Sequence, residues 1–309
     1  MPAPDHILFV FVDGIGLGPA TEDANPFARL RLPGFERLAG GAPLTDRAAP
    51  IREADHAFFG IDATLEVEGL PQSGTGQAAL FTGLNAPRLA GQHYGPYPPT
   101  ATYDAIASAN IFRQIATQTG IGIGEQAFAN AYPPPFFTHA ETRNRWTVTT
   151  RCCREAGVRI RTMDDLRAGE ALAADLTNRG LRDKLGIDVD PVTEETAADR
   201  LARLARRHRF TLFEYYLTDK AGHSQDVDTA AGVLASFDRF LGTLLETFDP
   251  RDTLFVLTSD HGNLEDLSTR SHTRNPVPFA ALGAGAAQLH EVRDLTEVVP
   301  ALLRLWQPA

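Results

Sequence analysis

The chain has 309 residues, of which 43% are hydrophobic and 22% charged, a composition typical of a globular protein with a sizeable buried core. Its formal net charge of −10 argues against general nucleic-acid binding, because a phosphate backbone is bound through a clustered basic surface. No stretch approaches the roughly 18 apolar residues of a membrane span, and the first residues lack the pattern of a signal peptide. We therefore expect a cytoplasmic protein without nucleic-acid or membrane partners.

The positions of the two cysteines are consistent with a cytoplasmic protein. Cys152 and Cys153 are adjacent, so they cannot link distant parts of the fold, and a disulfide between neighbours is strained. We expect unpaired thiols, as is usual in a reducing environment.

The pattern of apolar residues predicts an α/β fold. Residues 7–13 form a continuous apolar run that ends in a glycine-rich turn, as in a strand buried on both faces. Runs of the same character occupy residues 211–217, 253–259 and 277–282. Residues 227–248 carry apolar side chains at helical spacing, and strand, helix and strand in this order indicate a right-handed parallel crossover. We expect a three-layer sandwich around a mostly parallel central sheet.

The region from about residue 91 to 190 has a different character. It is rich in Tyr, Pro and Gly at 93–99 and 130–137, and its later part has weaker periodicity. We interpret it as a small inserted cap on a single domain of residues 1–309, although some of its elements could be sheet strands. Its aromatic residues could pack in the core, form a wall for a flat ligand, or form the face of a homodimer.

Six Asp and His residues lie beside the predicted strands, where an open parallel sheet binds ligands beyond its carboxyl ends. They are Asp13, Asp219, His223, Asp260, His261 and, in the loop before the last strand, His272. Three carboxylates brought together in this way repel one another unless cations neutralise them. Mixed carboxylate and imidazole ligands suit Zn²⁺ or Mn²⁺, with Mg²⁺ as a further possibility. More ligands than one tetrahedral ion needs indicate two divalent metal ions.

A candidate nucleophile lies in the glycine-rich segment 70–83. Ser73 and Thr75 precede a short apolar helix, whose first N–H groups can bind an anion. A hydroxyl group beside a metal ion could be deprotonated at neutral pH and attack phosphorus or sulfur. Capping of the helix is the alternative role for Ser73.

The motifs FVDG, TDKAGH, SDHGN and HTRNPVPF, with a serine in a glycine-rich turn, resemble the metalloenzyme core of the alkaline phosphatase superfamily. The likeness is greatest to cofactor-independent phosphoglycerate mutase and phosphopentomutase, and it extends over roughly residues 1–85 and 210–309. It implies two metal ions and a serine or threonine that is phosphorylated during turnover. By this resemblance, one metal is bound by Asp219, His223 and His272, and the other by Asp13, Asp260 and His261 with Ser73 as nucleophile and further ligand.

The sequence departs from the mutases in the middle of the chain. Those enzymes insert a large second domain after the nucleophile helix, whereas here only residues 84–210 separate that helix from the next predicted core strand. Without a domain that excludes water, a phosphoserine should be hydrolysed, so we expect a phosphatase or phosphodiesterase. The alternatives are a phosphomutase or phosphotransferase and a non-enzymatic metal-bound binding protein. A sulfatase is disfavoured, because QSGTGQ lacks the Pro and Arg of the sulfatase motif.

Four residues are candidate contacts for a small phosphorylated substrate. Lys220 lies between two predicted ligands, and His93 and Tyr94 belong to residues 93–99, the first of the two aromatic stretches. Asn25 follows the turn after Asp13, where a role in the turn is the alternative.

Overall fold

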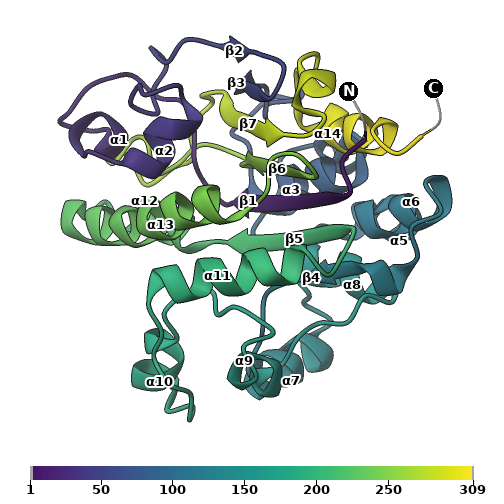
Figure 1. The fold of residues 1–309 in the computed structure, drawn as a ribbon. Helices are drawn as coiled ribbons and strands as arrows, with labels where there is room; N and C mark the ends of the chain where they lie inside the picture. Colours follow the sequence, from purple (N-terminus) through teal and green to yellow (C-terminus); the bar gives the residue numbers. More distant parts are fainter. Residues whose placement is uncertain (1–2, 308–309) are drawn as a thin grey trace.

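The structure, a computed structural model, describes residues 3–307 and contains one seven-stranded sheet in the order β2-β3-β7-β6-β1-β5-β4 (Figure 1). The strands are β1 (His6–Val12), β2 (Ile51–Arg52), β3 (His56–Ile61), β4 (Gln126–Phe128), β5 (Phe210–Tyr215), β6 (Thr253–Thr258) and β7 (Val277–Gly283).

Helices cover both faces of the sheet, as expected for a three-layer sandwich. The α-helices are α1 (Pro26–Arg29), α2 (Pro33–Leu38), α3 (Ser73–Thr82), α4 (Ala86–Ala90), α5 (Tyr103–Ala109), α6 (Ile111–Gln118), α7 (Pro134–Arg143), α8 (Val148–Ala156), α9 (Met163–Arg167), α10 (Arg179–Leu185), α11 (Glu194–Ala205), α12 (Leu217–Ser224), α13 (Val227–Thr247) and α14 (Leu295–Arg304). Three short 3₁₀ turns are η1 (Thr100–Thr102), η2 (Ile123–Glu125) and η3 (Ala286–Leu289).

Strand β1 shows how the core divides between the two faces. Phe9 and Phe11 belong to the hydrophobic cluster beneath α3 and α14, whereas Val10 and Val12 belong to the cluster beneath α11 and α13. Successive side chains of a strand point to opposite faces, so a continuous apolar run is needed when both faces are covered. This explains the unbroken apolar sequence of the central strands.

The prediction of a mostly parallel sheet is correct for one half only. Strands β6, β1, β5 and β4 are parallel, whereas β7 runs antiparallel to β6, and β3 and β2 continue the antiparallel half. The chain between β6 and β7 contains turns and no helix, and a parallel connection would need a longer crossover. The start of β7 therefore lies at the same edge of the sheet as the ends of β1, β5 and β6.

The region 91–190 combines core elements with an excursion. Strand β4 forms the edge of the sheet, and helices α5, α6 and α8 contribute residues to the cluster beneath α3. Helices α7, α9 and α10 instead extend away from the sheet beyond β4 (Figure 1). Residues of α9 and α10 belong to a small hydrophobic cluster around Met163 and Leu166, whereas Phe136 and Phe137 of α7 pack against the cluster beneath α3. We call residues 130–190 without α8 the cap.

The cysteines lie in α8 as free, buried thiols, and burial raises the pKa of both. None of the helices within residues 3–307 combines the length and the apolar composition that crossing a bilayer requires.

Candidate metal centre

The six predicted ligands meet at one edge of the sheet. Asp13 directly follows β1, Asp219 lies in the first turn of α12 after β5, and Asp260 follows β6. The antiparallel direction of β7 brings the loop with His272 to the same edge. The six form two groups of three, and the ligand atoms within each group lie within 4.8 Å of one another.

The first group consists of Asp219, His223 and His272. The Nε2 atoms of the two histidines are 3.1 Å apart, and they lie 3.4 and 3.5 Å from the Asp219 carboxylate. The Nδ1 atom of His272 donates to the carbonyl of Pro71, and that of His223 donates to the carbonyl of Arg270. In the neutral rings each Nε2 therefore carries a lone pair, and two facing lone pairs repel unless a cation lies between them.

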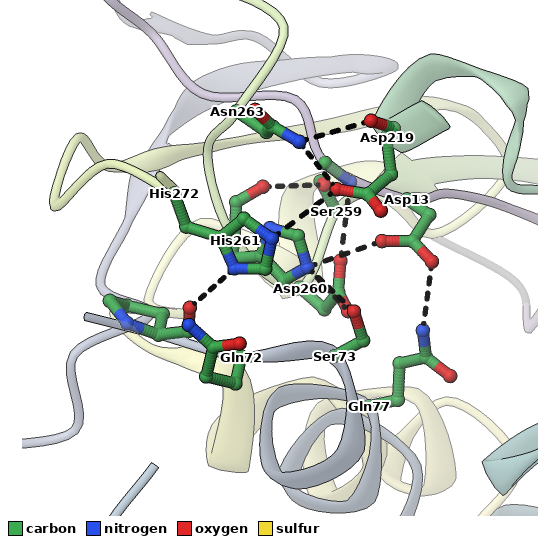
Figure 2. A network of polar contacts seen from close by, with 12 residues as sticks. Asp13, Gln72, Ser73, Gln77, Asp219, Ser259, Asp260, His261, Asn263 and His272 are labelled. Carbon is green, nitrogen blue, oxygen red and sulfur yellow. Dashed lines mark hydrogen bonds and ion pairs between the residues drawn. The ribbon is translucent and has the colours of Figure 1, made fainter. Parts of the chain in front are cut away.

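The second group consists of Asp13, Asp260 and His261, with Ser73 beside it (Figure 2). His261 Nε2 lies 3.0 Å from Ser73 Oγ, 3.2 Å from Asp13 Oδ1 and 3.5 Å from Asp260 Oδ2. A single imidazole nitrogen has at most one hydrogen to donate, so it cannot satisfy three oxygen atoms.

Two of these carboxylate oxygens give further evidence for a cation site. Within residues 3–307, neither Asp13 Oδ1 nor Asp260 Oδ2 accepts a hydrogen bond, although both are buried. Burial, followed by the charge of nearby carboxylates, raises the pKa of Asp13 well above its ordinary value, and burial also raises the pKa of Asp260. Buried carboxylates without partners are costly, and a divalent cation is the partner that this donor set fits. Both groups thus suit an ion such as Mn²⁺ or Zn²⁺.

Ser73 and Thr75 have different environments. Ser73 is the first residue of α3 and Gln72 holds the capping position, so Ser73 does not cap this helix. Its Oγ faces the second ligand group, at 3.0 Å from His261. The Thr75 hydroxyl is buried and accepts from the backbone N–H of Tyr94 at 3.0 Å. Of the two hydroxyls, Ser73 is the one available for chemistry.

Several supporting residues were not anticipated from the sequence. Gln77 lies one helical turn after Ser73 and donates to Asp13 at 3.1 Å, a spacing that could have identified it. Asn263, in the SDHGN motif, donates to Asp219 at 2.6 Å. Glu265 is buried behind these residues and links the loop after β1 to both ends of the connection between β6 and β7.

The four predicted substrate contacts lie in three different places. Lys220 lines the cavity above the two ligand groups, together with Ser73. His93 and Tyr94 line a separate hollow with Gln72. Asn25 is buried, caps α1 through the N–H of Phe27 and donates to a carbonyl, so its polar atoms serve the turn.

Comparison with solved structures shows the same fold over the whole chain. The PH0037 protein from Pyrococcus horikoshii matches with a TM-score of 0.58 at 14% identity, covering 99% of this chain and 98% of that one. Alkaline phosphatase from the Antarctic bacterium TAB5 matches with a TM-score of 0.57 at 13% identity, covering 99% and 100%.

The curated relatives match over shorter segments. The 2,3-bisphosphoglycerate-independent phosphoglycerate mutase of Halobacterium salinarum is 34% identical over 121 residues, which are 37% of this chain and 23% of that protein. The mutase of the same name from Methanopyrus kandleri is 33% identical over 129 residues, or 38% and 30%. The chain thus spans less than a third of the length of these relatives. The model of the Metalloenzyme superfamily, in contrast, matches residues 5–307. With this match over nearly the whole chain, the chain belongs to the Metalloenzyme superfamily and has an alkaline phosphatase-like fold.

Proposed function

We propose that the chain catalyses metal-dependent phosphoryl transfer with Ser73 as the nucleophile. The observation that carries the proposal is the position of Ser73 Oγ, 3.0 Å from His261 Nε2 and beside the unpartnered oxygens of Asp13 and Asp260. A hydroxyl at the start of a ten-residue helix also lies where backbone N–H groups and the helix dipole favour an anionic phosphoryl group.

The residues of the chain have separate roles in this reaction. Asp219, His223 and His272 would hold one metal ion, and Asp13, Asp260 and His261 would hold the other. When bound, such ions polarise phosphoryl oxygens and lower the pKa of a nearby hydroxyl.

The covalent step then involves the side chain of Ser73. The hydroxyl group of Ser73 gives up its proton to solvent, and its Oγ forms a bond to phosphorus while the bond to the ester oxygen breaks. The departing oxygen takes up a proton from solvent. Gln77 holds the Asp13 carboxylate in place through its hydrogen bond.

The phosphoryl group can leave Ser73 in two ways. Transfer to water would make the protein a phosphatase or phosphodiesterase, and transfer to a second hydroxyl would make it a phosphomutase. The names of the curated relatives favour the mutase. The cavity favours hydrolysis, because Lys220 is the one cationic side chain among its lining residues in the described part of the chain. A mutase that retains a phosphorylated acid needs more positive charge to hold its substrate.

The test uses metal-free protein reloaded with Mn²⁺ or Zn²⁺. We expect release of phosphate or nitrophenol from para-nitrophenyl phosphate or its bis-ester, and loss of that release in Ser73→Ala but not in Ser108→Ala, an exposed serine of α5. Isomerisation of 3-phosphoglycerate without free phosphate would favour the mutase. Unchanged activity in Ser73→Ala would refute the role of this serine, and a protein that binds metal but transfers no phosphoryl group would be a binding protein.

A further inference from the structure

A cavity of about 430 Å³ opens over the two ligand groups, a volume suited to a small molecule. Asp13, Ser73 and Asp219 line it on the side of the metal centre. Large side chains from the cap, the preceding loop and the end of β5 supply much of the rest of its lining: Tyr97, Tyr132, Phe136, Leu181, Leu185 and Tyr216.

These side chains form an apolar wall. The rings of Tyr132 and Phe136 are stacked with centroids 4.1 Å apart. Leu181 and Leu185 lie one helical turn apart on α10, and Leu185 is 60% exposed although it is a large apolar side chain that lines the cavity. Covering such a surface with an apolar group removes it from water and is favourable.

The charges in the cavity leave room for a single anionic group. The carboxylates of the two ligand groups offset most of the charge of two divalent ions, so the remaining positive charge suits one phosphoryl group. Glu214 also lines the cavity, where Thr149 donates to it at 2.7 Å. Lys220 Nζ lies 4.9 Å from the ring centre of Tyr216. For a second anion on the substrate, Lys220 is the single cationic partner among the described lining residues, and no guanidinium group offers a bidentate contact.

We infer that the cavity binds the alcohol part of the phosphoric ester and that this part is an uncharged aromatic or similarly flat apolar group. This inference rests on the proposed function for the chemistry at Ser73. Tyr132 is already stacked on Phe128 and on Phe136, so the edges of Tyr132 and Phe136 would contact the ring. Leu181 and Leu185 would cover its outer face. A substrate whose alcohol carries a carboxylate, such as a phosphorylated sugar acid, is disfavoured by the same wall, because the carboxylate would lose its hydration against apolar side chains.

Binding of phosphonates tests the inference without requiring turnover. Calorimetric titration of the Mn²⁺-loaded protein should show that phenylphosphonate binds at least about tenfold more tightly than methylphosphonate. Only the phenyl group is large enough to contact the apolar wall. 3-Phosphonopropanoate should bind no more tightly than methylphosphonate. Equal affinity for the phenyl and methyl compounds, or preference for the carboxylate, would overturn the inference.

Substitutions of wall residues test whether these side chains bind the phenyl group. Leu185→Ser and Phe136→Ser should each weaken phenylphosphonate binding severalfold and leave methylphosphonate binding within about twofold. Leu89→Ser is the matched control, since Leu89 is 52% exposed and lies on α4 away from the cavity. If neither wall variant changes the phenyl-to-methyl ratio, the apolar group binds elsewhere and the inference is wrong. Phenyl preference without any phosphoryl transfer would instead contradict the proposed function alone.

Discussion

Replacement of Glu265 should destabilise the loops that carry the candidate metal ligands. This carboxylate is 1% exposed and accepts hydrogen bonds from the backbone N–H groups of Gly16 and Asn263, both at 2.8 Å. Its other oxygen accepts from Asn275 at 3.0 Å and from the hydroxyl of Thr273. The partners belong to the loop after β1 and to the two ends of the β6–β7 connection, and these segments carry four of the six candidate metal ligands.

The magnitude follows from the donors that lose their acceptor. In Glu265→Ala, two buried backbone N–H groups would be unpaired at about 1–3 kcal/mol each, so we expect a loss of about 2–6 kcal/mol in the free energy of unfolding. In Glu265→Gln, the amide oxygen can still accept from the backbone pair. The Thr273 hydroxyl can rotate and the Asn275 amide can flip to accept from the new NH₂ group, so the loss should be nearer about 1 kcal/mol.

Urea unfolding of the metal-free proteins measures these differences, and metal analysis of the reloaded proteins measures the consequence for binding. Glu141→Ala is the control, because Glu141 is exposed on α7 and its replacement retains a good helix former. If Glu265→Ala loses less than about 1 kcal/mol and still binds two ions per chain, the carboxylate does not hold the loops together.

Three further changes probe the centre. Ser73→Ala should lower kcat by about 10³-fold or more in a phosphate-release assay while the metal content measured by elemental analysis stays the same. His272→Ala should reduce the metal content from two ions to one, because the first group loses a ligand, whereas His139→Ala, an exposed residue of α7, should retain both. Burial raises the pKa of Glu214 to about 7, so the unfolded chain loses this proton first and the metal-free protein should lose about 3 kcal/mol of stability as the pH rises from 4.5 to 7. Glu214→Gln should remove that part of the pH dependence of urea unfolding, and an unchanged slope would contradict the assignment.

The fold was predictable where the signal is local. The buried central strands are continuous apolar runs, and Asp13, Asp219 and Asp260 follow such runs directly, so their place at one edge of the sheet follows from parallel pairing. The place of His272 did not follow in this way. A residue before a parallel strand would lie at the opposite edge, and only the antiparallel pairing of β7 with β6 moves it to the ligand edge. Pairing direction depends on the connection between two strands, which the apolar pattern of each strand does not contain.

The supporting residues illustrate a different limit. Glu265 lies in a polar loop and looks like a solvated residue, because its partner Gly16 is 249 positions away in the sequence. Glu214 carried a clearer signal, since it is a single charged residue within an otherwise apolar strand. The first aromatic stretch was assigned to the cleft through His93 and Tyr94, whereas Tyr97 is the residue that lines the cavity of the centre.

Hydrogen bonds from the protein orient the candidate ligands of the centre. The Nδ1 atoms of His223 and His272 are fixed by backbone carbonyls, and Asp219 is fixed by Asn263. These contacts orient the candidate ligands, and they leave the two Nε2 atoms facing each other at 3.1 Å. The protein's own hydrogen bonds thus contribute to the order of the site. Metal affinity should therefore fall when an orienting contact is removed, even where every ligand is retained.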